Sequence, residues 1–151
     1  EVFVRDKHYC WLPATVLEYH SDHALVALTV PETWADSTFS KGGRDTSFAL
    51  QSSGIHSSVK NIPANKVDML VSEFGVPANS LRKVLYKDYE RGDLPKQNTQ
   101  GGGKRNMEDL IHQHPAAILY NLKERHLVQK PYTRVGDILI AMNPFVWIDE
   151  L

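Results

Sequence analysis

Short apolar runs separated by polar turns dominate the first seventy residues. EVFVRD, WLPATVLEYH and ALVALTV are rich in valine, leucine and aromatic residues, and the polar tetrad His20-Ser21-Asp22-His23 separates the second run from the third. Runs of this kind predict short β-strands, and the tetrad predicts a hairpin turn. Another short strand and a turn at Pro63-Ala64-Asn65 are expected in SVKNIPANKVDML. Four or five such strands predict a small all-β barrel over residues 1–70.

Two features modify this barrel. Residues 31–58 are rich in Ser, Thr and Gly, which predicts a long inserted loop with one weak strand at TSFAL. A mobile insertion is favoured over a partner-binding loop. Pro13 removes a backbone donor and predicts an edge or bulge position for the start of its strand.

Residues 71–105 predict a basic flexible linker. A short amphipathic helix is expected in SLRKVLYKDYERG with Ser80 as its N-cap, and the Gln-, Asn- and Gly-rich DLPKQNTQGGGKRN follows. From Arg82 to Arg105 there are seven basic and three acidic residues, a local charge of +4. A solvated linker is favoured over a polyanion-binding face, because charge runs keep linkers extended.

Residues 106–151 carry a different pattern. Asn106 predicts the cap of a short helix in MEDLIHQ, and Pro115 suits the first position of a second helix. One face of that second helix is expected to be apolar, formed by Ile118, Leu119, Leu122 and His126. A strand at Tyr132, a break at Gly136-Asp137 and a buried-type strand over residues 138–142 follow.

Asn143-Pro144 ends this last strand, because proline has no amide hydrogen to continue a ladder. In layered α/β proteins the ligand crevice lies at the carboxyl ends of strands. An asparagine amide offers donors and an acceptor that match adenine, and Phe145 and Trp147 offer flat apolar surfaces. A simple turn remains the alternative, because Asn-Pro alone initiates turns.

Composition and charge narrow the class of protein. The chain has 151 residues, 42% hydrophobic and 23% charged, as is ordinary for a soluble globular protein. Its net charge of −1 gives no reason to expect nucleic acid or an acidic membrane as partner. No apolar run exceeds the five residues of ILIAM, which is too short to span a bilayer, and the first residues do not predict a secretory signal. The single cysteine, Cys10, fits a reducing compartment and is expected to be buried and inert.

The stretch MEDLIHQHPAAILYNLKERHLVQKPYTRVGDILIAMNPF resembles the opening of a myosin motor head. About forty residues agree with that family in order and spacing. The matching residues are Met107, Asp109-Leu110, Pro115, Ile118-Leu119, Asn121-Leu122-Lys123-Glu124-Arg125, Tyr132-Thr133 and Asn143-Pro144-Phe145. VFVRD and WLPATVLEY resemble the small Src-homology-3-like barrel that precedes many myosin heads. His114 stands where the family usually has glutamate, and the segments 31–58 and 71–105 are longer than usual, which indicates a divergent or unconventional myosin.

The resemblance implies a mixed fold, with the barrel followed by the first helices and strand of an α/β motor head truncated at residue 151. It also implies an adenine pocket lined by Asn143, Pro144 and Phe145, with Trp147 close by. The implied activity is ATP hydrolysis with Mg²⁺ by a cytoplasmic, cytoskeleton-associated motor. Its implied partners are actin filaments and calmodulin-like light chains, bound through other parts of a longer chain.

No phosphate-binding loop is recognisable in this sequence. QGGGKRN lacks the spacing of Gly, four residues and Gly-Lys-Ser/Thr, because Arg105 follows Gly103-Lys104. We therefore expect no ATPase activity from these residues alone. No catalytic triad is recognisable either, and two histidine pairs, His20/His23 and His112/His114, do not predict a metal site.

A second hypothesis comes from a different class. Residues 1–70 would be a stand-alone barrel module, not an enzyme, that binds a peptide or a modified tail, with 106–151 as an unrelated helical extension. An aromatic cage of Tyr9, Trp11 and Tyr19 would serve such a module, but a role in the barrel core is favoured.

Overall fold

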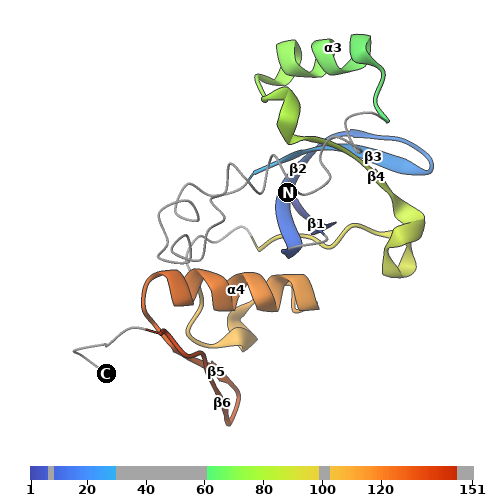
Figure 1. Ribbon diagram of the computed structural model, residues 1–151. Helices are drawn as coiled ribbons and strands as arrows, with labels where there is room; N and C mark the ends of the chain where they lie inside the picture. The colour runs from blue at the N-terminus through green and yellow to red at the C-terminus, as the bar shows by residue number, and fades with distance from the viewer. Residues whose placement is uncertain (7–8, 30–60, 99–102, 146–151) are drawn as a thin grey trace. The chain divides into compact units, whose positions relative to one another are not determined.

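The computed structural model describes residues 1–6, 9–29, 61–98 and 103–145. The chain forms two compact units, Glu1–Pro95 and Lys96–Leu151 (Figure 1). The insertion predicted at 31–58, with its weak strand, lies outside the described residues, and so does Trp147.

A curled, antiparallel four-stranded sheet, which forms half of a barrel, is the framework of the first unit (Figure 1). Its strands are β1 (Val2–Asp6), β2 (Cys10–Tyr19), β3 (His23–Leu28) and β4 (Leu81–Leu85), in the order β1-β2-β3-β4. The predicted hairpin turn joins β2 to β3, and His20 N donates to His23 O at 2.9 Å across it. The mixed fold class predicted from the sequence is confirmed, since helices and strands of a second unit follow this sheet.

Strand β4 corrects the sequence-based interpretation, which placed an amphipathic helix here. Leu81 to Leu85 pair with β3, with Val26 opposite Arg82 and Ala24 opposite Val84. Ser80 caps no α-helix: it ends the 3₁₀ turn η3 (Ala78–Ser80), is buried, and donates through Oγ to Pro77 O at 2.7 Å. A short apolar run is compatible with either a helix or a strand. Here the segment forms a strand because it pairs with the edge of β3. Two further 3₁₀ turns follow, η4 (Tyr86–Asp88) and η5 (Glu90–Gly92).

Helix α3 (Ala64–Phe74) is the second correction, because a strand and a turn were expected there. Pro63 stands at its N-cap, and Gly75 ends it with a left-handed φ of 64° while its N–H donates to Val71 O at 3.0 Å. Proline before a helix and glycine after it are strong boundary signals. Reading them with the helical spacing of Val67, Leu70 and Val71 would have found this helix.

Helix α3 contributes to the core of the first unit. Leu70 is fully buried and belongs to one apolar cluster with residues of β3 and β4, and Lys66 Nζ contacts Glu18 Oε1 of β2 at 2.5 Å. The buried members of the cluster are Leu25, Ala27, Ile62, Leu70 and Leu81, with Leu17, Val67, Val71 and Val76 packed against them.

Pro13 lies in the first part of β2, where the described sheet pairs it with β1 and the pairing with β3 begins only at Ala14, so the predicted edge position for the start of this strand is confirmed. It stands opposite Phe3, whose N–H donates outward to Pro95 O at 2.7 Å. The nitrogen of Pro13 therefore faces the other side, where β3 ends at Leu28 and the ladder needs no further donor. The bulge of β2 falls later, between Val16 and Glu18.

The second unit contains η6 (Met107–Asp109), α4 (Pro115–Leu127), β5 (Tyr132–Val135) and β6 (Ile138–Ala141). Strands β5 and β6 form an antiparallel hairpin with Val135 opposite Ile138. Gly136 supplies the left-handed φ of 56° that this tight turn requires, as the predicted break at Gly136-Asp137 indicated. Pro115 occupies the start of α4, as predicted.

Burial in the second unit differs from the sequence-based expectation in two places. Strand β6 is exposed rather than buried, with Ile138 67% and Leu139 60% accessible. In α4, Leu119 of the predicted apolar face is 49% accessible, whereas the polar residues Asn121 and Arg125 are 4% and 6% accessible. The helical periodicity correctly predicted a helix, but the predicted apolar face is not the most buried one. The face that carries Asn121 and Arg125 is more buried, because these side chains form hydrogen bonds.

Candidate functional site

The segment that follows β6 contains three of the four predicted nucleotide-binding residues. Asn143 Oδ1 accepts a hydrogen bond from Phe145 N at 2.9 Å, and Phe145 has a left-handed φ of 54°. The turn that the sequence left open as an alternative is therefore present. It occupies only one lone pair of the amide oxygen, and no partner for Nδ2 lies among the described residues.

The side chains of this turn are accessible. Phe145 is 81% exposed, Asn143 is exposed and Pro144 is half-buried. His126 of α4 holds the backbone from the other side, with its Nε2 3.2 Å from Asn143 O. An amide with free donors thus lies beside an exposed ring on a segment tethered to a helix, which provides both groups suited to a flat, hydrogen-bonding base.

Helix α4 and strand β5 are joined by a buried arginine. Arg125 donates from Nε to Thr133 Oγ1 at 2.9 Å and from Nη2 to Tyr132 O at 2.6 Å. Thr133 is only 1% accessible. Burial lowers the pKa of Arg125 from its usual value, and the nearby positive charge of Arg105 acts in the same direction. These contacts explain in physical terms why Arg125 and Tyr132-Thr133 occur together in the matched stretch.

A second polar clamp holds the segment before η6 against α4. Asn121 accepts from Lys104 N through Oδ1 at 2.5 Å and donates through Nδ2 to Lys104 O at 3.0 Å. Arg125 Nη1 also contacts Gly103 O at 3.4 Å. Gly103 and Lys104 are thus packed against α4, so the prediction of a flexible linker is wrong for these two residues. The sequence signal that was missed is the spacing of Asn121 and Arg125, one helical turn apart.

His114, at the position where the resemblance leads us to expect glutamate, is the N-cap of α4. Its Nδ1 accepts from Ala117 N at 3.2 Å, and its Nε2 lies 2.7 Å from Lys96 O. Both contacts are satisfied when Nε2 carries the proton and Nδ1 does not.

Lys123, in the middle of the matched motif, is electrostatically unusual. Burial lowers the pKa of Lys123 to about 8, against the opposing effect of Glu124. The side chain of Lys123 is half-buried. A lysine so desolvated favours the neutral form more than an ordinary lysine does.

The remaining sequence candidates do not assemble into a site among the described residues. Cys10 is exposed, with a φ of 63°, so the expected buried thiol is wrong. Tyr19 and Trp11 lie near opposite ends of the ten-residue β2, which separates the members of the considered aromatic cage. Trp11 instead packs near Tyr89, with ring centroids 6.3 Å apart, and Arg5 lies over both rings.

The described part of the chain shows neither a metal-binding cluster nor a membrane-spanning helix. No three His, Cys, Asp or Glu side chains converge there on a common metal position. His20 and His23 stack at 4.3 Å, each beside one carboxylate, Glu18 and Asp22 respectively. No helix within the described ranges is both long and apolar enough to cross a membrane.

The first unit is half of a barrel, and a helix and a hairpin joined by the hydrogen bonds of Arg125 follow it in the second unit. This order of elements is consistent with the one that the myosin resemblance implied. Comparison with known proteins agrees. Myosin-15 of Arabidopsis thaliana is 31% identical over 90 residues, 60% of this chain and 6% of that protein. Myosin-H heavy chain of Dictyostelium discoideum is 40% identical over 57 residues, 37% of this chain and 3% of that protein. Protein OPAQUE1 of Zea mays is 41% identical over 51 residues, 34% of this chain and 3% of that protein.

These matches confirm the resemblance to myosin heavy chains and support a myosin N-terminal region. No protein-family model matches the chain. The chain spans 6% or less of the length of these curated relatives.

Proposed function

We propose that this chain is the N-terminal part of a myosin motor, an ATP-hydrolysing protein that moves on actin filaments. The observation that supports this most is the coincidence of the matched residues with the polar contacts of the second unit. Asn121, Arg125 and Thr133 are buried at 4%, 6% and 1% accessibility; Asn121 bonds to the backbone of Lys104, and Arg125 bonds to Thr133. A shared sequence motif that also explains the local packing is stronger support than the motif alone.

Within that motor the chain contributes the adenine-side wall of the nucleotide pocket. Asn143 presents its unengaged Nδ2 donors to the base, Pro144 and Phe145 supply apolar surface, and Trp147 follows in the sequence. Tethering of the turn by His126 restricts its freedom before nucleotide binds, which reduces the entropy lost on binding.

The hydrolysis itself belongs to other parts of the motor. Phosphoryl transfer to water requires a phosphate-cradling loop and Mg²⁺, and Gly103 of the QGGGKRN run packs against α4. We therefore propose that the chain alone does not turn over ATP. Actin filaments and calmodulin-like light chains would bind elsewhere on the cytoskeletal motor.

The test uses the full-length motor head. Asn143→Ala combined with Phe145→Ala should raise the KM for ATP about tenfold, since one hydrogen bond and one ring contact are lost. Lys130→Ala, at an exposed position after α4, is the matched control and should leave KM unchanged. An unaltered KM in the double variant would refute the role of these residues in binding adenine. A full-length head without ATPase activity would refute the proposal that the protein is a motor.

A further inference from the structure

A buried arginine of β4 lies in an apolar part of the first unit. Arg82 is 8% accessible, and its neighbours across and along the sheet, Val26 and Val84, are buried too. Burial lowers the pKa of Arg82, while the negative charge of Asp6 opposes this shift. A guanidinium remains protonated even then, so its charge has to be balanced by hydrogen bonds or by an anion.

The hydrogen bonds of Arg82 are incomplete. Nη1 donates to Asn79 O at 2.9 Å and to Leu81 O at 2.7 Å, but Nη2 is buried and has no partner. The described ion pairs do not include Arg82. Asp6, whose negative charge acts on Arg82, accepts a hydrogen bond from Tyr9 N at 2.9 Å through Oδ1. A buried charged donor without an acceptor is costly, and an anion close to the guanidinium would reduce that cost.

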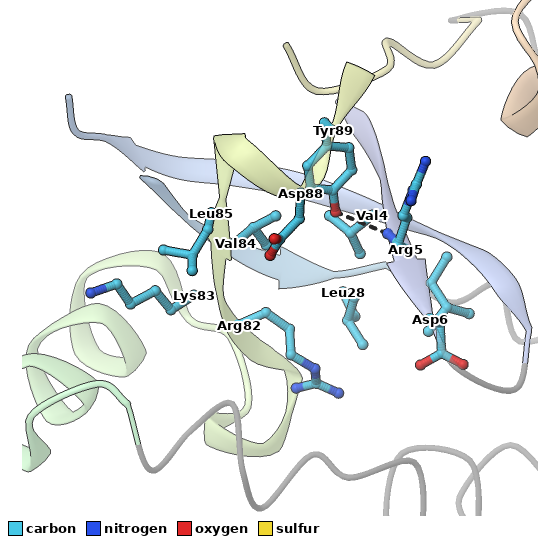
Figure 2. Close-up of a pocket in the computed structure, with 11 residues that line it drawn as sticks. Val4, Arg5, Asp6, Leu28, Arg82, Lys83, Val84, Leu85, Asp88 and Tyr89 are labelled. Atoms are coloured by element: carbon cyan, nitrogen blue, oxygen red, sulfur yellow. Dashed lines mark hydrogen bonds between the residues drawn. The ribbon is translucent and has the colours of Figure 1, made fainter. Parts of the chain in front are cut away.

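A cavity of about 200 Å³ adjoins Arg82, which is one of the residues that line it. Figure 2 shows the guanidinium of Arg82 at the same end of the cavity as Asp6, with Leu28 between them, while Arg5 and Lys83 extend away from its centre. Val4, Leu12, Leu28, Val84, Leu85 and Tyr89 form the apolar part of the wall, and Arg5, Asp6, Arg82, Lys83 and Asp88 the charged part.

We propose that this cavity is a binding site for a carboxylate carried on a small apolar body. A carboxylate matches the planar guanidinium and neutralises its charge, and the apolar wall accommodates the rest of the ligand. Arg5 and Lys83 extend away from the cavity, so the Arg82 guanidinium is the positive group that remains for an anion there. A single carboxylate pairs with this one guanidinium, whereas a doubly charged phosphate is repelled more strongly by the carboxylates of Asp6 and Asp88.

The proposal is tested on the whole 151-residue chain by NMR titration with benzoate, with its neutral isostere benzamide and with inorganic phosphate. Benzoate should shift the side-chain NH signals of Arg82 and the amide of Val84 in a saturable way. Benzamide should bind at least about tenfold more weakly, because a charge-assisted hydrogen bond is lost. Phosphate should give no saturable shift. Equal binding of benzoate and benzamide, or no saturable response to benzoate, would overturn the proposal.

Matched variants of neighbouring residues locate the site. Arg82→Met should weaken benzoate binding at least about tenfold, and Lys83→Met, whose side chain extends away from the cavity, should change it less than about twofold. Retained affinity in a folded Arg82→Met chain would refute the assignment. If that variant does not fold, the benzoate-to-benzamide ratio of the unmodified chain decides the question.

Two peptide arms identify the source of the carboxylate. An acetylated and amidated peptide with one central glutamate tests an acidic side chain, and its glutamine counterpart is the control. Displacement of benzoate by the glutamate peptide alone supports a protein partner, whereas displacement by neither peptide, with benzoate still bound, supports a small free carboxylate. Displacement by both peptides to the same extent would contradict recognition of a carboxylate.

Discussion

Gly103 lies so close to Arg125 that a Cβ atom added at Gly103 would stand 2.3 Å from Arg125 Cγ. The same atom would also lie 2.8 Å from Asn121 O and 2.9 Å from Arg125 N, which are backbone atoms of α4 and cannot rotate away. The third glycine of the QGGGKRN run is therefore required by packing. This contact allows the clamp between Lys104 and Asn121 to close.

Gly103→Ala should destabilise the second unit by about 1–3 kcal/mol, the usual cost of forcing atoms into a filled site. Urea unfolding followed by the NMR signals of α4 measures it. Lys130→Ala, at an exposed position, should stay within about 0.5 kcal/mol of the unmodified chain. Equal stability of the two variants would show that the segment before η6 does not rest on α4.

Thr133→Val should cost about 1–3 kcal/mol, because it leaves the buried Nε of Arg125 without an acceptor while preserving side-chain shape. Thr133→Ser keeps the hydroxyl and should recover most of the loss. The same urea titration distinguishes the two. A valine variant as stable as the serine variant would mean that the hydrogen bond contributes nothing.

His114→Ala should destabilise α4 by about 1 kcal/mol through loss of the cap on Ala117 N. His114→Asn provides a side-chain oxygen suited to the same cap and should come close to the original stability. Amide exchange at Ala117 gives a local measurement. Unchanged exchange in the alanine variant would show that the ring does not cap the helix.

Lys123 makes the stability of the second unit depend on pH. The folded pKa of about 8 lies below the ordinary lysine value of 10.5, so the unfolded state binds more protons between these two values. Stability from this group therefore rises with pH across that window, and the penalty is complete below pH 8.

Lys123→Met removes that penalty. The variant should be more stable than the original chain at pH 7, and the difference should disappear as the pH approaches 10.5. Urea midpoints of both proteins over this range measure it. A difference that stays constant with pH would contradict the desolvation of Lys123.

Strand β6 should exchange its amide hydrogens much faster than β3. Ile138 and Leu139 are 67% and 60% accessible on a two-stranded hairpin, whereas Val26 is fully buried between two neighbouring strands. An isolated hairpin is marginally stable in water, which lowers the free energy of local opening. Equal protection of residues 138–141 and Val26 in a hydrogen-exchange experiment would refute this.

Local patterns predicted a large part of the fold. The apolar run in EVFVRD, the polar tetrad from His20 to His23, and Gly136 at a tight turn all specify structure within a few residues, and the strand and the turns that they predicted are confirmed. Pro115 likewise marked the start of α4. Such signals depend on backbone geometry and do not need knowledge of the rest of the chain.

Features that depend on distant partners were missed. Leu81 to Leu85 became a strand only because β3 offers an edge from far earlier in the sequence. Arg125 is buried because Thr133 and Tyr132 O accept from it, and Arg82 is buried although one of its nitrogens has no partner. No local rule foresees such burial, because arginine is ordinarily exposed.

The adenine wall stays a prediction for a related reason. Asn143, Pro144 and Phe145 are adjacent in sequence, so the structure places them together by necessity, and Trp147 lies outside the described residues. The detail added by the structure is the engagement of Asn143 Oδ1 with Phe145 N, which leaves Nδ2 as the group available to a base.

Photolabelling of the full-length motor head with a nucleotide that carries a reactive group on adenine shows which residues contact the base. We expect the label to attach within residues 143–147, and excess ATP to prevent the attachment. Specific labelling confined to other parts of the head, with Asn143 and its neighbours unmodified, would contradict it.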